Sequence, residues 1–83
     1  MKKDERTDIS ERALPPRIEL CSNTFCCVEG IKKILDCSEK CIKFNLGKRN
    51  AVFCGDSLYI RSFSSDGAVI EGIIVSLEFE DDD

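Results

Sequence analysis

Apolar and polar residues alternate with a period of two through most of the chain after Pro16. The clearest case is 41–46, where Ile42, Phe44 and Leu46 fall on one side. Strict alternation is typical of a half-buried strand. The pattern predicts strands at 17–21, 24–29, 31–37, 41–46, 51–54, 58–63, 68–71 and 73–79.

Short polar and glycine-containing segments separate these predicted strands. Ser22-Asn23 has turn chemistry, 47–50 reads as a hairpin loop, 55–57 as a break and 64–67 as a turn. In the last strand the alternation predicts that one set of side chains faces the core and another faces solvent. The expected inward residues are Ile73, Val75, Leu77 and Phe79, and the expected outward residues are Ser76, Glu78 and Glu80.

The first 16 residues are charged and do not share this pattern. Residues 8–14 could hold one or two helical turns, which Pro15-Pro16 would end. We therefore predict a charged N-terminal arm (1–16), flexible or short-helical, then one all-β domain (17–80) and an acidic tail (81–83). The expected architecture is a single small domain of short, mostly antiparallel strands with glycine bends: a roll, a barrel or a sandwich.

A short glycine motif recurs in the predicted strands. Val28-Glu29-Gly30-Ile31 matches Ile70-Glu71-Gly72-Ile73, and Phe53-Cys54-Gly55 is a partial third copy. Glycine inside a strand pattern marks a bulge, a sharp bend or a close backbone approach. We interpret the motif as a set of bends that fold one long ribbon over its own core.

Length and composition limit the options further. The 83 residues are enough for one domain, and 42% are hydrophobic. The start of the sequence, MKKDERTDISER, has no apolar segment typical of a secretory signal, so we expect a cytoplasmic location. Net acidity is concentrated at 78–83, and the middle of the chain is nearly neutral. This is not the basic surface of a nucleic-acid-binding protein, and no apolar run is long enough for direct membrane insertion.

Six cysteines raise the question of a metal or redox site: Cys21, Cys26, Cys27, Cys37, Cys41 and Cys54. In a cytosolic protein we expect reduced thiols acting as small apolar residues. Only Cys37 and Cys41 have ligand-like spacing, and the sequence contains no His to complete a zinc site. Cys26 and Cys27 are adjacent, so in a strand they should point to opposite faces.

Catalytic motifs are also missing from the sequence. Without His, Ser-His and Cys-His arrangements are excluded, and neither a P-loop nor a G-x-S-x-G motif occurs. We therefore predict no catalytic, cofactor-binding or metal-binding residues, and no enzyme activity. Tyr59, Arg61 and Phe63 should share a face opposite Leu58 and Ile60, which suggests either a contact surface or the second face of a sandwich.

The order of these short motifs resembles the YabP/YqfC family of small sporulation proteins from endospore-forming Firmicutes. The resemblance covers about four-fifths of the chain. Its entry motif, Leu14-Pro15-Pro16-Arg17-Ile18, is closer to the YqfC branch but contains an extra proline. The other matching segments are Val28-Glu29-Gly30-Ile31, Ile42-Lys43-Phe44, 54–60, 70–74 and Ser76-Leu77-Glu78-Phe79.

The resemblance implies a small non-catalytic protein made in the mother cell during sporulation. It also implies work at the forespore membrane or in cortex or coat formation, with a membrane-bound sporulation protein as a partner. Exposed strand edges would allow self-association as well. The alternative hypothesis is a cysteine-based metal-binding or redox module that uses Cys37, Cys41 and two of Cys21, Cys26, Cys27 and Cys54.

Overall fold

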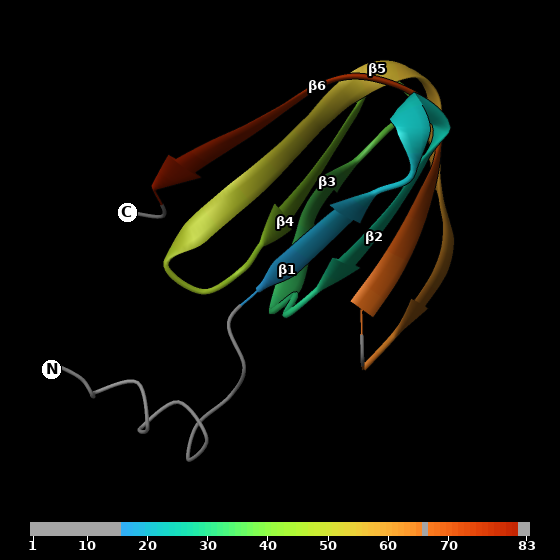
Figure 1. Cartoon of the computed structure of the whole chain (residues 1–83). Helices are drawn as coiled ribbons and strands as arrows, with labels where there is room; N and C mark the ends of the chain where they lie inside the picture. Colours follow the sequence, from blue (N-terminus) through green and yellow to red (C-terminus); the bar gives the residue numbers. More distant parts are fainter. Residues whose placement is uncertain (1–15, 66, 82–83) are drawn as a thin grey trace, which may run out of the picture.

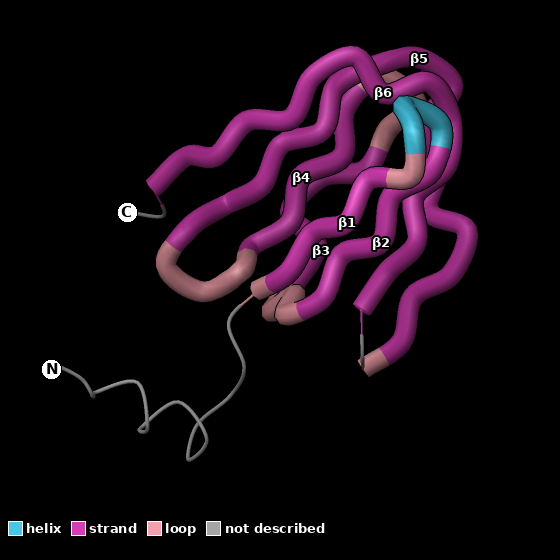
Figure 2. The backbone as a smooth tube through the Cα atoms, viewed as in Figure 1, coloured by secondary structure: helices cyan, strands magenta, loops and turns pink. Residues whose placement is uncertain are grey.

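The computed structural model describes residues 16–65 and 67–81. Two long antiparallel strands form a central hairpin, to which the other strands are added. These strands are β5 (Arg49–Ser64) and β6 (Gly67–Asp81). The shorter elements are β1 (Arg17–Leu20), a 3-10 turn η2 (Ser22–Thr24), β2 (Phe25–Glu29), β3 (Lys33–Cys37) and β4 (Cys41–Asn45). The predicted all-β class is confirmed, as Figure 2 shows, and every strand pairing is antiparallel.

The strands form one sheet in the order β1-β2-β6-β5-β4-β3. β5 and β6 pair with each other from Arg49↔Asp81 to Ser64↔Gly67. Along β5, only the first part pairs with β4, and along β6, only the first part pairs with β2. β3 and β1 then pair with the outer sides of β4 and β2. The long hairpin therefore carries two added strands on each of its halves, and it arches over so that these halves face each other (Figure 1).

Glycine allows the hairpin to bend. The register of β5 and β6 shifts between Cys54/Gly55 and again between Asp56/Tyr59. Gly72 has φ +129°, and a Cβ added there would lie 2.8 Å from the Leu58 Cα of the paired strand. A side chain at this position would be strained and would also collide with backbone. The predicted glycine bend is thus present at Gly72, whereas Gly30 (φ +85°) follows the end of β2.

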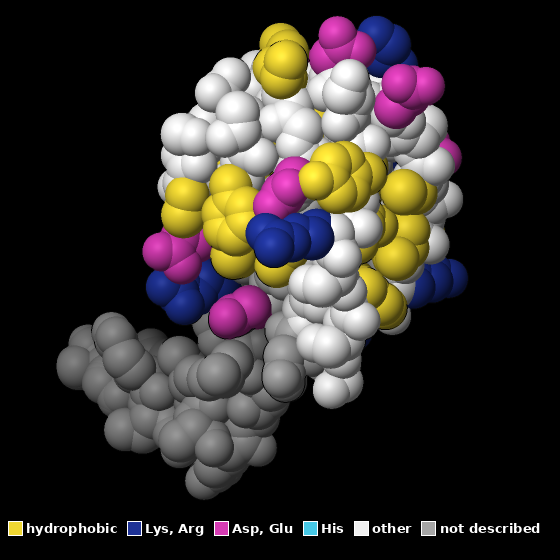
Figure 3. All heavy atoms as spheres, turned by 90° about the vertical axis from the view of Figure 1, so that its right-hand side faces the viewer, with side chains coloured by type: hydrophobic (Ala, Val, Ile, Leu, Met, Phe, Trp, Pro, Cys, Tyr) yellow, Lys and Arg dark blue, Asp and Glu magenta, His cyan; other side chains and the backbone are white. Residues whose placement is uncertain are grey.

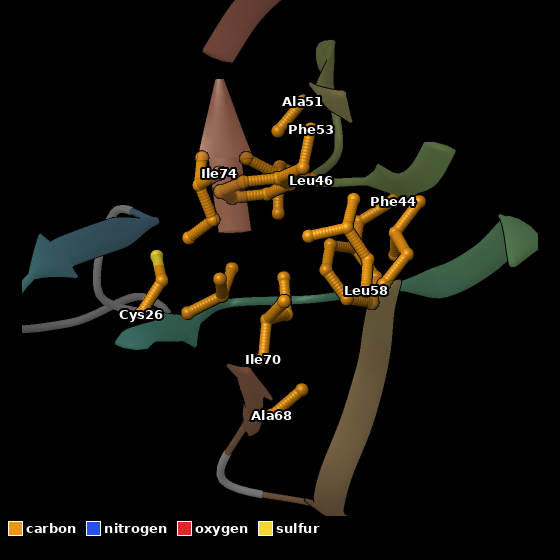
Figure 4. Packing of buried hydrophobic residues seen from close by; sticks show 11 residues of the cluster. Cys26, Phe44, Leu46, Ala51, Phe53, Leu58, Ala68, Ile70 and Ile74 are labelled. Carbon is orange, nitrogen blue, oxygen red and sulfur yellow. The ribbon is translucent and has the colours of Figure 1, made fainter. Parts of the chain in front are cut away.

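Both halves of the hairpin contribute to a single core. Phe44 and Phe53 are fully buried, and their rings meet edge to face with centroids 6.0 Å apart. Figure 4 shows side chains from opposite halves pointing into the same space. The buried cluster contains Cys26, Val28, Ile42, Phe44, Leu46, Ala51, Phe53, Leu58, Ala68, Ile70 and Ile74. The inward face predicted for Ile42, Phe44 and Leu46 is confirmed.

The face predicted for the start of the last strand was wrong. Ile74 is buried, whereas Ile73 and Val75 are 48% and 74% exposed. The cause is a β-bulge: Ser76 pairs with Cys54 and Ile74 with Gly55, so Val75 is an extra residue without a partner. Because side chains alternate between the two faces of a strand, one extra residue reverses which side chains face the core in the part of β6 that precedes the bulge.

Beyond the bulge the prediction for this strand holds only in part. Leu77 packs against the core as expected, and Ser76, Glu78 and Glu80 are more exposed than the core positions. Phe79 lies opposite the buried Ala51 but remains 53% exposed at the end of the sheet.

Strand boundaries also differ from those predicted. The expected break at 55–57 is a bend within β5, and the segments 68–71 and 73–79 form one strand. β6 continues to Asp81, which pairs with Arg49, so the first residue of the predicted acidic tail belongs to the sheet. The predicted arm lies outside the described residues except for Pro16.

Candidate interaction surface

The six cysteines are distributed over β2, β3, β4, β5 and the residue that follows β1, and they do not share one site. Cys26 is buried and its neighbour Cys27 is partly exposed, so the predicted opposite orientation is confirmed. Burial raises the pKa of Cys26 to about 11, with smaller contributions from Cys27 and Cys21. Across residues 16–65 and 67–81, no group of three or more His, Cys, Asp or Glu is placed to hold a metal ion. The cysteine tetrad of the alternative hypothesis is therefore not assembled there.

The bent hairpin creates more sheet edges than a flat sheet would have. β1 and β3 are the two formal edges. Because β4 pairs with β5 only up to Cys54, the later residues 59–63 of β5 have a ladder partner only in β6 among the described strands. An edge of this kind presents backbone N–H and C=O groups that another strand can pair with.

Residues 59–63 contain fewer charged residues than the edge strands β1 and β3. The segment Tyr59-Ile60-Arg61-Ser62-Phe63 has one charged residue in five. Tyr59 and Phe63 are 50% and 54% exposed. Hydrophobic and charged side chains gather side by side on this side of the molecule, as Figure 3 shows. Exposed aromatic residues next to arginine are enriched at protein–protein contacts. We name residues 59–63 the β5 edge.

Glu71 of β6 organises the β5 edge. Its carboxylate accepts a hydrogen bond from the Tyr59 hydroxyl and an ion-pair hydrogen bond of 2.7 Å from Arg61. These contacts fix both side chains on the outer face of the sheet, since Tyr59 and Glu71 are register partners. The hydrogen bond from Tyr59, then that from Arg61, lowers the pKa of Glu71, and the same Tyr59–Glu71 bond raises the pKa of Tyr59.

The prediction that Phe63 shares the face of Tyr59 was wrong. The register shifts between Ile60 and Ser62, so Arg61 is an extra residue in β5. Phe63 consequently lies opposite Ala68, a core residue, on the inner side of the sheet. It remains half exposed at the rim, so the β5 edge has an aromatic residue near each of its ends, on opposite faces.

Ion pairs, charged side chains and bulges, which discourage strand pairing, occur at the other edges, although the β5 edge itself has a bulge at Arg61 and the Arg61–Glu71 ion pair. β1 has an Arg17–Glu19 ion pair. β3 is exposed along its length and has a bulge at Leu35 between Lys33 and Asp36. The end of β6 is acidic, and Glu80 pairs with Lys43 at 2.9 Å. Charges and bulges of this kind oppose edge-to-edge association.

One open pocket lies at the end of the core. Its volume is about 330 Å³, and it is lined by Pro16, Leu46, Lys48, Arg49 and Phe79. Among the described residues, the lining supplies two cations and apolar surface and contains no carboxylate.

Tyr59, Arg61 and Phe63 were predicted as a candidate contact surface from the sequence, but Glu71, the partner of Tyr59 and Arg61, was not. Glu71 was identified only as a member of the recurring glycine motif. Its contact with Tyr59 depends on the register of two strands, which the alternation of one strand does not specify.

Comparison of the chain with protein-family models, curated proteins and solved structures gives no match. Within the described parts of the chain, none of the helical structure has the length and apolar character needed to cross a membrane.

Proposed function

We propose that the chain is a non-catalytic interaction module whose β5 edge pairs with an extended segment of a partner protein. The observation that supports this proposal most strongly is that the β5 edge carries little charge and is flanked by two half-exposed aromatic residues, Tyr59 and Phe63. Strand addition at such an edge supplies main-chain hydrogen bonds for affinity, and the flanking side chains supply specificity. Tyr59 and Arg61, held by Glu71, would contact one face of the incoming strand.

The family resemblance supplies the biological setting of the proposal. We place the module in the cytoplasm of the mother cell during sporulation, at the forespore membrane or in cortex or coat formation. The partner is then a protein, with a membrane-bound sporulation protein as the first candidate, and self-association through strand edges is the second. The acidic net charge of −4 supports a protein partner over nucleic acid.

Capture experiments with matched variants test this proposal. Tagged protein would be purified from sporulating cells as wild type, as Phe63→Lys and as Leu35→Lys. A lysine on an edge opposes strand pairing, and both positions are exposed at an edge. We expect Phe63→Lys to lose a partner that wild type and Leu35→Lys retain. Retention by all three, or loss with Leu35→Lys alone, would contradict the assignment of the edge.

The cysteine-based metal-binding or redox module is a separate hypothesis, and its metal-binding form has its own test. Elemental analysis of protein purified without chelators measures bound zinc or iron directly. One metal ion per chain, with stability lost on adding EDTA, would establish it in place of the interaction module. Substoichiometric metal and stability that is indifferent to EDTA would remove it.

A further inference from the structure

Two of the six thiols face each other across neighbouring strands. Cys41 of β4 and Cys54 of β5 are register partners. Their sulfur atoms are 3.9 Å apart, in a weak S–H···S hydrogen bond. Ile42 and Phe53, the next pair, point into the core, so the two cysteines lie on the outer face of the sheet.

Backbone hydrogen bonds identify the type of pair. The Gly55 N–H donates to the Lys40 carbonyl at 3.0 Å, and the Leu46 N–H donates to the Arg49 carbonyl at 2.8 Å. Both bonds belong to the β4–β5 register, in which hydrogen-bonded and non-hydrogen-bonded pairs alternate. Cys41 and Cys54 are one step from Lys40 and Gly55, so they form a non-hydrogen-bonded pair.

Non-hydrogen-bonded pairs bring side chains closest. Their Cα atoms are about 4.5 Å apart, which lies inside the range of about 4.4–6.8 Å seen in disulfides. A sulfur–sulfur bond is about 2.05 Å long, so the two sulfurs need to approach by roughly 2 Å through side-chain rotation. Neither strand has to leave the ladder.

Both thiols are partly exposed, so a small reagent can reach them. The remaining cysteines provide internal comparisons. Cys26 is buried, and Cys21 and Cys37 are exposed, and no other sulfur–sulfur hydrogen bond occurs among the described residues. Cys37 lies opposite Ile42, a core residue, and so points to the other face of the sheet from Cys41.

We propose that Cys41 and Cys54 are a redox-active dithiol that a small-molecule disulfide, such as oxidised glutathione, converts into a cross-strand disulfide. One thiolate attacks the reagent, forms a mixed disulfide and releases one reduced thiol. The facing thiolate then attacks the protein sulfur of the mixed disulfide and releases the second reduced thiol. Overall, two protein thiols are oxidised, one reagent disulfide is reduced, and the two protein protons pass to the departing thiolates.

The surroundings of Cys41 set the pH dependence of this exchange. Burial, followed by the hydrogen bond and charge of Cys54 and the charge of Asp36, raises the pKa of Cys41, and Lys43 opposes this rise. Only the thiolate attacks a disulfide. Attack by Cys41 is therefore slow at neutral pH and accelerates as the pH rises.

Mass spectrometry of the full chain in glutathione redox buffers tests the site. After quenching and alkylation of the remaining thiols, we expect wild type to lose two thiols together and to yield a peptide cross-link between Cys41 and Cys54. The matched control Cys37→Ser should retain this cross-link. Cys41→Ser should instead hold glutathione on Cys54, and Cys54→Ser should hold it on Cys41, because the resolving thiol is gone.

A melting measurement adds a readout that does not depend on peptide mapping. The bridge closes a short loop, so the oxidised wild type should melt on the order of 10 °C above the reduced form. Neither single variant should show this shift. Stable glutathione adducts on both Cys41 and Cys54 of wild type would overturn the proposal. So would a bridge to another cysteine, or retention of both thiols under conditions that modify Cys21 and Cys37.

Discussion

Replacing Gly72 with alanine tests the bend that gives the hairpin its shape. Gly72 has φ +129°, a conformation that costs a residue with a side chain about 1–3 kcal/mol. The added Cβ would also lie 2.8 Å from the Leu58 Cα. Carbon atoms in contact prefer about 3.5–4.0 Å, so the paired strand would have to shift by roughly 1 Å.

Gly47 is a matched control for the strain alone. It has φ +107°, but the nearest atom to an added Cβ is the flexible Lys32 Cε at 4.0 Å. Overpacking against a fixed neighbour typically costs about 1–3 kcal/mol. We therefore expect Gly72→Ala to lose about 2 kcal/mol more free energy of unfolding than Gly47→Ala.

Urea denaturation followed by circular dichroism measures this difference. With a slope of about 1 kcal/mol per molar urea for a small protein, the midpoint of Gly72→Ala should lie roughly 2 M below that of Gly47→Ala. Complete loss of the folded baseline in Gly72→Ala alone would agree with the same reasoning. Equal midpoints for the two variants would refute it, because Leu58 would then not restrict position 72.

Three further predictions concern the core, the ion pairs and the thiols. Phe53→Ala should cost about 3–5 kcal/mol in denaturant unfolding, whereas Phe79→Ala, at a half-exposed site, should cost less than about 1 kcal/mol; similar losses would place Phe79 in the core. The lowered pKa of Glu71 means that its contribution to stability is present above the ordinary value of 4.5 and is lost as the pH falls through the folded-state pKa. The melting difference between wild type and Glu71→Gln should therefore shrink below pH 4.5, and growth of that difference would contradict the ion-pair network. Cys26 is buried and its pKa is raised to about 11, so it should resist a thiol reagent at mildly alkaline pH until the protein unfolds. The exposed Cys21 and Cys37 should react at once. Rapid labelling of Cys26 in the folded protein would contradict its burial.

The alternation of apolar residues predicted the fold class and the core face of β4, because strand periodicity is a property of one segment at a time. Ile42, Phe44 and Leu46 are buried as the pattern indicates. The same argument failed at Ile73 and Val75, where the bulge exposes both residues. A bulge is defined by two strands together, so the sequence of β6 alone does not reveal it.

The candidate surface could be predicted only in part for the same reason. Tyr59 and Arg61 were identified from their own strand. Their contacts with Glu71 and the inward register of Phe63 depend on how β5 aligns with β6. Cys41 and Cys54 are thirteen positions apart in sequence, and they lie opposite each other only because of the register between β4 and β5.

The central claim is that the β5 edge receives a strand from a partner protein. Site-specific photo-crosslinking in sporulating cells tests it most directly, with a photoreactive residue in place of Phe63 and, as the matched control, in place of Leu35 on β3. We predict a crosslinked product from position 63 that is absent from position 35. Crosslinking from position 35 alone, or from neither position, would contradict the claim.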